Sequence, residues 1–305
     1  MKEAVSVSLG SSARDKRVEI ELDGVPVALE RRGTDGDAAK AASLFTALDG
    51  QVDALGVGGI DLWLTVDGRR YPLHAGHRLV EGVRRTPVVD GSGLKESLEY
   101  GCADALAPLL QNRRVRVLVT AAVDRYGMAR SFVNAGHEVI FGDLMFGFGL
   151  PLPMRRLRTL HIIARPLLPV VGHLPFSLLY PTGERQEEIR PRFERWYRWA
   201  DVIAGDCHYV RRHMPDDLQG KIVVTNTTTA ADLELFGQRG VQAVLTTTPS
   251  YGGRSFGTNL LEAGITAVAG KGRPLTVEEL RHWLKRLALR PTLHALAPVA
   301  SAGQR

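Results

Sequence analysis

VRVLVTAAVDRYGMARSFVNAGHEVIFGD, residues 115–143, decides the fold class of this chain. It begins with a continuous apolar strand, VRVLVT (115–120), of the kind that is buried on both faces of a parallel sheet. A loop, a helix (128–135), a stop at Gly136 and a second strand (137–143) follow. This is one strand–helix–strand unit of about thirty residues, which is the length that a parallel crossover needs.

Three similar units follow it, each an apolar strand with a connection. Their strands are DVIAGD (201–206), KIVVTN (221–226) and VQAVLTTTP (241–249). Strands of this type that alternate with helices indicate a Rossmann-like, doubly wound parallel sheet. Helices are also expected over 94–110 and over the charged stretch 185–200. The last predicted helix, 277–288, begins with a capping box in which Thr276 is the cap and Glu279 is three residues on.

The length of 305 residues favours two domains. Residues 1–111 read as a smaller α/β domain that would bind the substrate, with three strands near its start and a tight turn at Asp23-Gly24. A second hairpin is expected over 62–73, around Asp67-Gly68. Residues 112–305 would form the Rossmann-like nucleotide-binding domain, with an apolar insertion at 150–182 and a C-terminal helix.

The composition restricts the classes of partner and of site that we expect for this chain. The net charge of +6 suits an anionic partner, but the arginines are scattered and no nucleic-acid-binding signature accompanies them. The two cysteines, Cys102 and Cys207, suggest neither a disulfide scaffold nor a metal site. No secretory signal is visible at the start, so the expected location is the cytoplasm.

The stretch 160–181 is apolar over a length close to a membrane span. It contains Arg165 and internal prolines, which a lipid-exposed helix does not readily accommodate. We therefore expect broken helices that pack on the core or at a subunit interface, and a homo-oligomer. A membrane-surface or assembly role for this segment is the alternative.

The strand ends carry the expected ligand site, because open parallel sheets bind ligands beyond the carboxyl ends of their strands. Asp143 lies 22 positions beyond Ala121, where dinucleotide-binding domains place an acid that holds a ribose. The G-x-G-x-x-G fingerprint is absent, and TAAVDRYGMA (120–129) stands in its place. The candidate cofactor-binding residues are Ala121, Ala122, Asp124, Arg125, Gly127, Asp143, Asn226 and Thr227.

Two pairs are candidates for proton transfer. Lys95 and Asp90 lie on one glycine turn, where a lysine with a lowered pKa accepts a proton and the carboxylate orients it. Asp206 and His208 share another strand end, where Asp would fix the tautomer of His. An ordinary helix cap is the alternative explanation for each pair. Ser92 and Arg254 are candidate substrate-binding residues, since Arg254 would clamp a carboxylate or phosphate.

Several strings of the sequence are specific when taken together; they include VSVSLGSSARDKRVE (5–19), TPVVDGSGLK (86–95), AAVDRYGMA (121–129), FGDLMFGFGLP (141–151) and VTNTTTAAD (224–232). With them the chain resembles the bacterial proteins labelled quinate 5-dehydrogenase, relatives of the quinate and shikimate dehydrogenases. The resemblance implies an oxidoreductase that uses NAD or NADP to oxidise a cyclic hydroxy acid. The alternative function is a non-redox Rossmann-like protein that binds a sugar, nucleotide or carboxylate. In either case the expected partner is a small anionic or polyhydroxy molecule, not a nucleic acid or a membrane.

Overall fold

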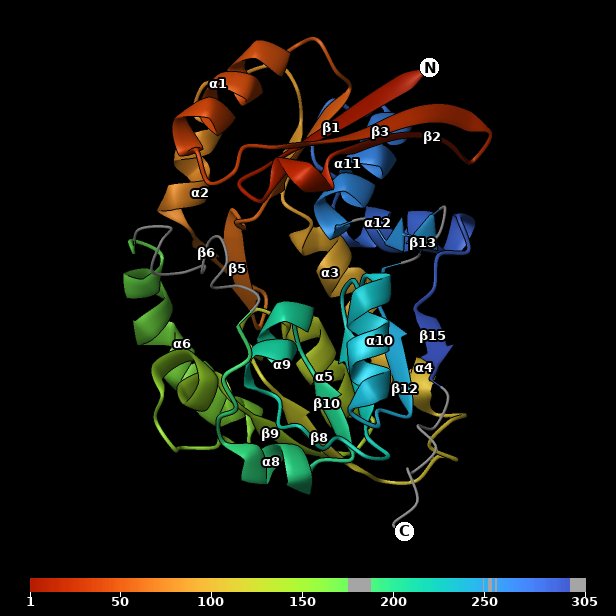
Figure 1. The fold of residues 1–305 in the computed structure, drawn as a ribbon. Coiled ribbons are helices and arrows are strands. Elements are labelled where there is room, and N and C mark those ends of the chain that lie inside the picture. Colours follow the sequence, from red (N-terminus) through yellow and green to blue (C-terminus); the bar gives the residue numbers. More distant parts are fainter. Residues whose placement is uncertain (175–187, 249, 252–253, 256, 297–305) are drawn as a thin grey trace. The chain divides into compact units, whose positions relative to one another are not determined.

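The computed structural model describes residues 1–174, 188–248, 250–251, 254–255 and 257–296 of the chain (Figure 1). The chain forms two compact units, each assembled from three segments. Unit 1 comprises Met1–Ser97, His161–Gln186 and Phe256–Leu289, and unit 2 comprises Leu98–Leu160, Glu187–Ser255 and Arg290–Arg305.

Unit 1 contains a five-stranded sheet in the order β2-β3-β1-β4-β7, in which β1, β3, β4 and β7 are parallel and β2 is antiparallel. The strands are β1 (Lys2–Ser8), β2 (Lys16–Leu22), β3 (Val25–Gly33), β4 (Ala54–Gly58) and β7 (Val88–Val89), with a separate hairpin of β5 (Trp63–Val66) and β6 (Arg69–Pro72). Both predicted hairpin turns are confirmed: Asp23-Gly24 and Asp67-Gly68 have positive φ at both positions, as a type I′ turn requires.

Helices cover both faces of this sheet. On one face, Val5, Val7, Leu55 and Val57 pack against Phe45 and its neighbours in α1 (Ala38–Leu48) and α2 (His74–Leu79). On the other face lies α11 (Thr258–Ala269), which contacts β1, β3 and β4 although it is distant in sequence (Figure 1). The other helical elements of unit 1 are η1 (Ser12–Arg14), α3 (Ser92–Glu99), which begins in it, and α12 (Val277–Arg286).

Small residues on β4 explain how α11 comes so close. A Cβ atom on Gly56 would lie 2.9 Å from the carbonyl oxygen of Asn259, and one on Gly58 would lie 2.8 Å from its Nδ2. The side chain of Asn259 donates to Ser6 Oγ at 3.0 Å and to the carbonyl of Val57 at 2.7 Å. The glycines of this strand are therefore a packing requirement of unit 1.

Unit 2 contains a six-stranded sheet in the order β15-β12-β11-β10-β8-β9, in which only β15 is antiparallel. The strands are β8 (Arg116–Val119), β9 (Glu138–Phe141), β10 (Val202–Ala204), β11 (Ile222–Thr225), β12 (Ala243–Thr246) and β15 (Thr292–Ala295). The four strand-and-connection units predicted from the sequence provide the parallel strands. The Rossmann-like, doubly wound fold class is thereby confirmed.

The core of unit 2 is formed by side chains that alternate along these strands between the two faces of the sheet. Leu118, Ile203 and Val223 point to a face that is covered by Tyr197, Val210 and Phe236 from three helices. The helical elements of unit 2 are α4 (Cys102–Leu106), α5 (Tyr126–Asn134), η2 (Asp143–Gly147), α8 (Glu194–Trp199), α9 (Cys207–His213) and α10 (Ala230–Gln238). A short hairpin pairs β13 (Ser250–Tyr251) with β14 (Arg254–Ser255).

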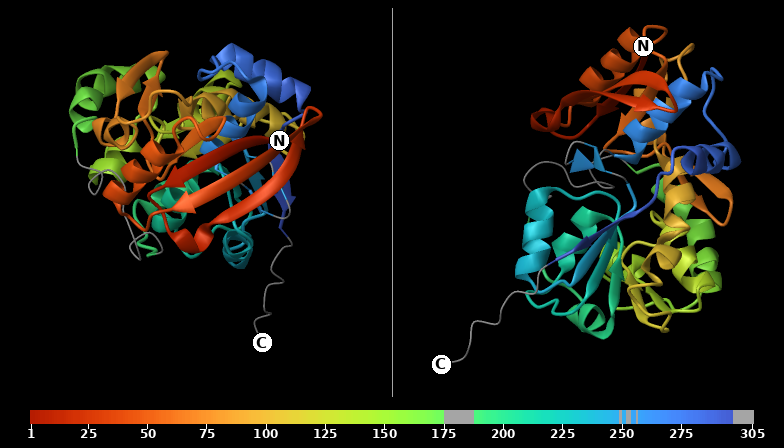
Figure 2. Two further views of the ribbon diagram at one scale, coloured as in Figure 1. Left: turned by 90° about the horizontal axis from the view of Figure 1, so that it is seen from above. Right: turned by 90° about the vertical axis from the view of Figure 1, so that its right-hand side faces the viewer.

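Three elements differ from the sequence prediction. The helix expected over 94–110 is divided into α3 and α4 at Tyr100-Gly101. The charged helix expected over 185–200 is α8 alone within the described residues, because Pro191 disfavours helical backbone before it. Strand β15 was not predicted, because Thr292–Ala295 is a short segment whose pairing with β12 is distant in sequence; Figure 2 shows it beside β12.

The apolar stretch forms α6 (Leu157–Val171), which continues through Pro166 and Pro169. Both prolines are exposed, as are Ile162 and Arg165, whose carbonyl groups lose the hydrogen bonds that these prolines are unable to donate. Among the residues that the structure describes, no helix is both long and apolar enough to span a membrane. The part of the stretch from residue 175 on lies outside the described residues.

The division into units follows other boundaries than the domains expected from the sequence. The chain first passes between units after Ser97, not at residue 112. The segments 161–186 and 256–289, which include most of the apolar insertion and the last helix, belong to unit 1.

Candidate functional site

The carboxyl ends of the parallel strands in unit 2 meet at one edge of its sheet. The chain leaves β8 toward β9 on one side and later forms β10 on the other side of β8. The edge between β8 and β10 is therefore the switch point at which open α/β sheets bind ligands. The polar residues that follow the strands there are Thr120, Asp143, Asp206, Asn226 and Thr247.

Arg125, in the loop after β8, is buried at this edge with 3% of its surface exposed. Its guanidinium donates to Glu99 Oε1 at 2.9 Å and to Asp206 Oδ2 at 2.8 Å, and its Nε lies 3.1 Å from Asp124 Oδ2. Burial alone would lower the pKa of Arg125, but these three carboxylates outweigh it and raise that pKa. We call these four residues the Arg125 cluster.

Asp206 links the cluster to the next strand. Its Oδ2 accepts from Asn226 Nδ2 at 2.9 Å as well as from Arg125, and its Oδ1 caps α9 by accepting from the amide of His208 at 3.0 Å. Asn226 Oδ1 accepts in turn from the amide of Cys207 at 3.2 Å. Both side chains are thus held in one orientation before any ligand binds.

The two side chains keep hydrogen-bonding capacity. Asp206 accepts three hydrogen bonds within the described chain, whereas a carboxylate has about four acceptor positions. The amide nitrogen of Asn226 uses one of its two N–H groups on Asp206. The side chain of Asp206 is 25% exposed, so the remaining positions are open to solvent.

Asp143 turns toward the loop after β8. Its Oδ1 accepts from the amide of Val123 at 2.8 Å, and its Oδ2 is enclosed without a hydrogen-bond partner among the described residues. Burial raises the pKa of Asp143 to about 6, although the amides of Val123 and Ala122 act in the opposite direction. The carboxyl group therefore holds the loop rather than facing a ribose.

The loop that was expected to hold a pyrophosphate has no room or charge for it. Ala122 is fully buried, and Gly127 lies buried inside the first turn of α5. Ala121 is partly exposed, but the adjacent Arg125 cluster holds three carboxylates against one guanidinium. A phosphate would meet like charge at this point.

The remaining candidates of unit 2 are placed as follows. His208 is exposed, and its backbone amide rather than its ring contacts Asp206. Thr227 is partly buried beside Asn226, and Thr229 forms the capping box of α10 with Asp232. The expected Asp206–His208 proton relay is therefore not formed through the imidazole.

In unit 1, Lys95 and Asp90 do not form the expected pair. Lys95 Nζ donates to Asp61 at 2.7 and 2.9 Å, while Asp90 Oδ2 accepts from the amides of Leu62 and Trp63. Asp90 Oδ1 accepts from the amide of Ser92 at 2.9 Å, which fixes the turn before α3.

Sequence reasoning missed three carboxylates: Glu99, Asp61 and Glu262. Glu262 is 4% exposed, and its Oε2 accepts from the amide of Leu94 at 2.8 Å. Burial, together with the charge of Asp90, raises the pKa of Glu262 to about 8. A single acid within the apolar helix LLEAGITAVA was the available signal for Glu262, whereas no local pattern marks the other two.

Arg254 lies in β14, but its side chain is outside what the structure describes. Within the described ranges, no group of three or more His, Cys, Asp or Glu residues is arranged to hold a metal ion. Cys102 and Cys207 are both buried, and burial raises the pKa of each thiol.

Two family models match the sequence, each described as a domain of unknown function. The model described as Domain of unknown function (DUF8753) matches residues 3–90, and that described as Domain of unknown function (DUF8754) matches residues 93–296. No curated protein matches the chain.

The chain is also similar to solved structures at low identity. An arabinose-binding protein from Geobacillus stearothermophilus is 12% identical with a TM-score of 0.37, covering 80% of this chain and 81% of that chain. A solute-binding protein from Burkholderia graminis C4D1M in complex with D-arabinose is 8% identical with a TM-score of 0.39, covering 99% and 98%. A 5-methylthioribose transporter solute-binding protein from Thermotoga lettingae TMO is 11% identical with a TM-score of 0.37, covering 96% and 85%.

The expected resemblance to quinate and shikimate dehydrogenases is wrong. The solved structures above are sugar-binding or other solute-binding proteins, and neither family model describes a dehydrogenase. The predictions of an oxidoreductase and of an NAD or NADP cofactor, which followed from that resemblance, are wrong as well. The physical reason lies in the loop after β8, where a buried arginine and its carboxylates occupy the place of a phosphate-binding turn. Since its model matches more than half of the sequence, this chain belongs to the family described as Domain of unknown function (DUF8754).

Proposed function

We propose that unit 2 binds a small, neutral polyhydroxy ligand, a sugar or sugar-like molecule, at the edge between β8 and β10 without redox chemistry. The observation that carries this proposal is the pairing of Asp206 with Asn226. A carboxylate with a remaining acceptor position lies beside an amide with a remaining N–H. A hydroxyl group both donates and accepts, so one hydroxyl satisfies the two at once.

The charge of the site favours a neutral ligand over an anionic one. Glu99, Asp124 and Asp206 surround a single guanidinium, and Arg125 already directs its donors to them. A nucleotide or carboxylate would bring further negative charge to this edge. A neutral ligand would gain a charge-assisted hydrogen bond from Asp206 at no such cost.

Further hydroxyl groups follow the neighbouring strands. The backbone amides of Thr247 and Thr248 donate to the carbonyls of Thr225 and Asn226, so the residues after β12 lie beside those after β11. The Oγ1 atoms of Thr247 and Thr248 are buried and have no hydrogen-bond partner among the described residues. These hydroxyls extend the polar edge with groups that a bound sugar would satisfy.

The test is calorimetry and thermal melting of the whole chain with a panel of neutral pentoses and hexoses, their phosphates, and NAD and NADP. We expect a neutral sugar to bind and raise the melting temperature, and its phosphate to bind more weakly. The Asp206→Asn variant should weaken sugar binding roughly tenfold or more, because a hydrogen bond to a charged group contributes about 1.5–3 kcal/mol.

Asp201 provides the matched control, since it lies at the opposite end of the same strand and pairs with exposed Arg116. The Asp201→Asn variant should bind the sugar as the unmodified chain does. The proposal is refuted if Asp206→Asn and Asp201→Asn bind every sugar with equal affinity, or if no neutral sugar binds to the unmodified chain.

A further inference from the structure

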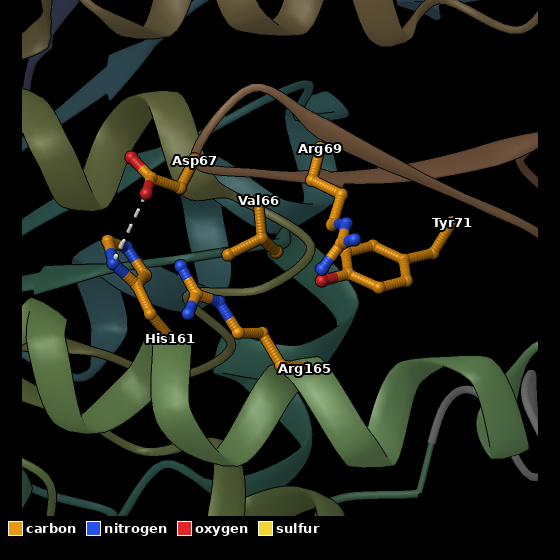
Figure 3. A pocket seen from close by; sticks show the side chains of 6 residues that line it. All are labelled: Val66, Asp67, Arg69, Tyr71, His161 and Arg165. Atoms are coloured by element: carbon orange, nitrogen blue, oxygen red, sulfur yellow. Dashed lines mark ion pairs between the residues drawn. The ribbon is translucent and has the colours of Figure 1, made fainter.

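Unit 1 contains a pocket that the proposed function does not use. It is a cavity of about 230 Å³ between the β5–β6 hairpin and α6. Its lining residues are Val66, Asp67, Arg69, Tyr71, His161 and Arg165, and Figure 3 shows their side chains around the cavity.

One wall of the pocket is a face of the β5–β6 hairpin, on which every second residue points to the same side. Val66 pairs with Arg69 and Leu64 pairs with Tyr71, so these four side chains share one face of the two-stranded sheet. Tyr71 is 7% exposed, and its hydroxyl group makes no hydrogen bond within the described residues. A buried phenol therefore presents an unused donor to the cavity.

Helix α6 forms the opposite wall. His161 and Arg165 are four residues apart, which places them on the same face of the helix. The end of α6 is fixed next to the hairpin, because the carbonyl of Gly172 accepts from the amide of His74, the first residue of α2, at 3.0 Å. A Cβ atom on Gly172 would lie 2.3 Å from the carbonyl oxygen of Pro72. This close backbone contact holds the two walls in place.

The charge in the pocket is predominantly positive. Asp67 Oδ2 lies 3.6 Å from His161 Nδ1, as the dashed line in Figure 3 marks. Arg69 and Arg165 make no ion pair and no hydrogen bond with any residue that the structure describes. Two guanidinium groups thus line one cavity without an ion-pair partner among the described residues, and their mutual repulsion is relieved when an anion binds.

We propose that this pocket is a binding subsite for a small oxyanion, a phosphate or carboxylate group. Arginine presents a planar set of donors that fits either group through paired hydrogen bonds. The Tyr71 hydroxyl adds a further donor. The cavity has the volume of several water molecules at about 30 Å³ each, which suits one oxyanion with a few attached atoms. This site is separate from the sugar site and does not depend on it.

The experiment is calorimetric titration of the whole chain with sodium phosphate and, separately, with sodium malonate, at constant ionic strength set by sodium chloride. We expect at least one of the two anions to bind. The variants Arg69→Ala and Arg165→Ala should each weaken that binding roughly ten- to a hundredfold, as loss of charge-assisted hydrogen bonds predicts. Tyr71→Phe should weaken it about three- to tenfold. Preference for phosphate or for malonate identifies which oxyanion the subsite takes.

Two arginines are matched controls. Arg70 lies on the same strand but on the other face, where it stacks on Trp63 at 4.5 Å, and Arg158 is an exposed residue of α6 that does not line the pocket. Arg70→Ala and Arg158→Ala should bind the anion as the unmodified chain does. If neither anion binds at tens of millimolar, or if the control variants lose as much affinity as Arg165→Ala, the proposal is overturned.

Discussion

At the scale of single residues, the most consequential group in unit 1 is the carboxyl of Glu262. It is the one acid in an otherwise apolar stretch of α11, and it lies against the amide of Leu94. Because burial disfavours its charged form, the group takes up a proton at a pH at which an exposed glutamate is ionised. The residue therefore couples the stability of unit 1 to pH.

The variant Glu262→Gln should reveal this coupling. The pKa of Glu262 is about 8 in the folded chain against an ordinary 4.5, so the folded state binds more protons between these values. Its stabilising contribution is present below pH ~4.5 and is lost as pH rises through about 8. The free energy of unfolding of the unmodified chain should fall by a few kcal/mol relative to the variant over that range. Urea unfolding at a series of pH values measures this difference.

Glu278 gives the control, because it is exposed in the first turn of α12. Replacing it with Gln removes the same charge from the surface and should leave the pH dependence unchanged. If the free energy of unfolding depends on pH in the same way for Glu262→Gln and for the unmodified chain, Glu262 does not couple stability to pH.

At the scale of elements, the start of α12 illustrates a structure that local sequence specifies. Thr276 accepts from the amide of Glu279 at 3.2 Å, and Glu279 accepts from the amide of Thr276 at 2.8 Å, which confirms the capping box expected from the sequence. Each contact joins residues only three positions apart, so the pattern can be recognised without knowledge of the fold.

The variant Thr276→Ala should lower the free energy of unfolding by about 1 kcal/mol, because the amide at the third helical position loses its acceptor. Thr276→Ser keeps the hydroxyl and should retain nearly all of the stability. Denaturant unfolding compares the three proteins, and equal losses for Ala and Ser would show that the methyl group, not the cap, matters.

At the scale of the whole molecule, each unit is assembled from segments that are distant in the chain. Helix α11 buries Leu260, Leu261 and Ile265 against the sheet of unit 1, whose strands all precede residue 90. A cut after Ser97 would therefore separate this sheet from one of its two helical layers. The units are compact, but neither is a continuous stretch of sequence.

We therefore expect the fragments 1–97 and 98–305 to fold poorly when each is expressed alone, because both expose apolar surface that the other covers. Co-expression should recover a complex with the helical content of the intact chain. Size-exclusion chromatography with circular dichroism measures both outcomes. Cooperative unfolding of 98–305 alone would contradict the expectation.

The sequence by itself determined the fold class and the parallel strands of unit 2. Apolar runs of four to six residues identified the strands of unit 2, and turn residues identified both hairpins of unit 1. These features depend on alternation and backbone preference, which act between neighbours in the chain. The same reasoning placed polar residues such as Asp206 and Asn226 at the strand ends.

Only the tertiary structure decided which of these side chains meet. Lys95 pairs with Asp61 rather than Asp90, and Arg125 fills the loop after β8 through Glu99 and Asp206. Those partners lie 34, 26 and 81 positions away, so no local pattern selects them. The order of strands in the sheet and the demand of a buried charge for counter-ions select them instead. For this reason the sequence located the edge at which we propose that a ligand binds, while the pairing of charges carries the proposal that this ligand is neutral.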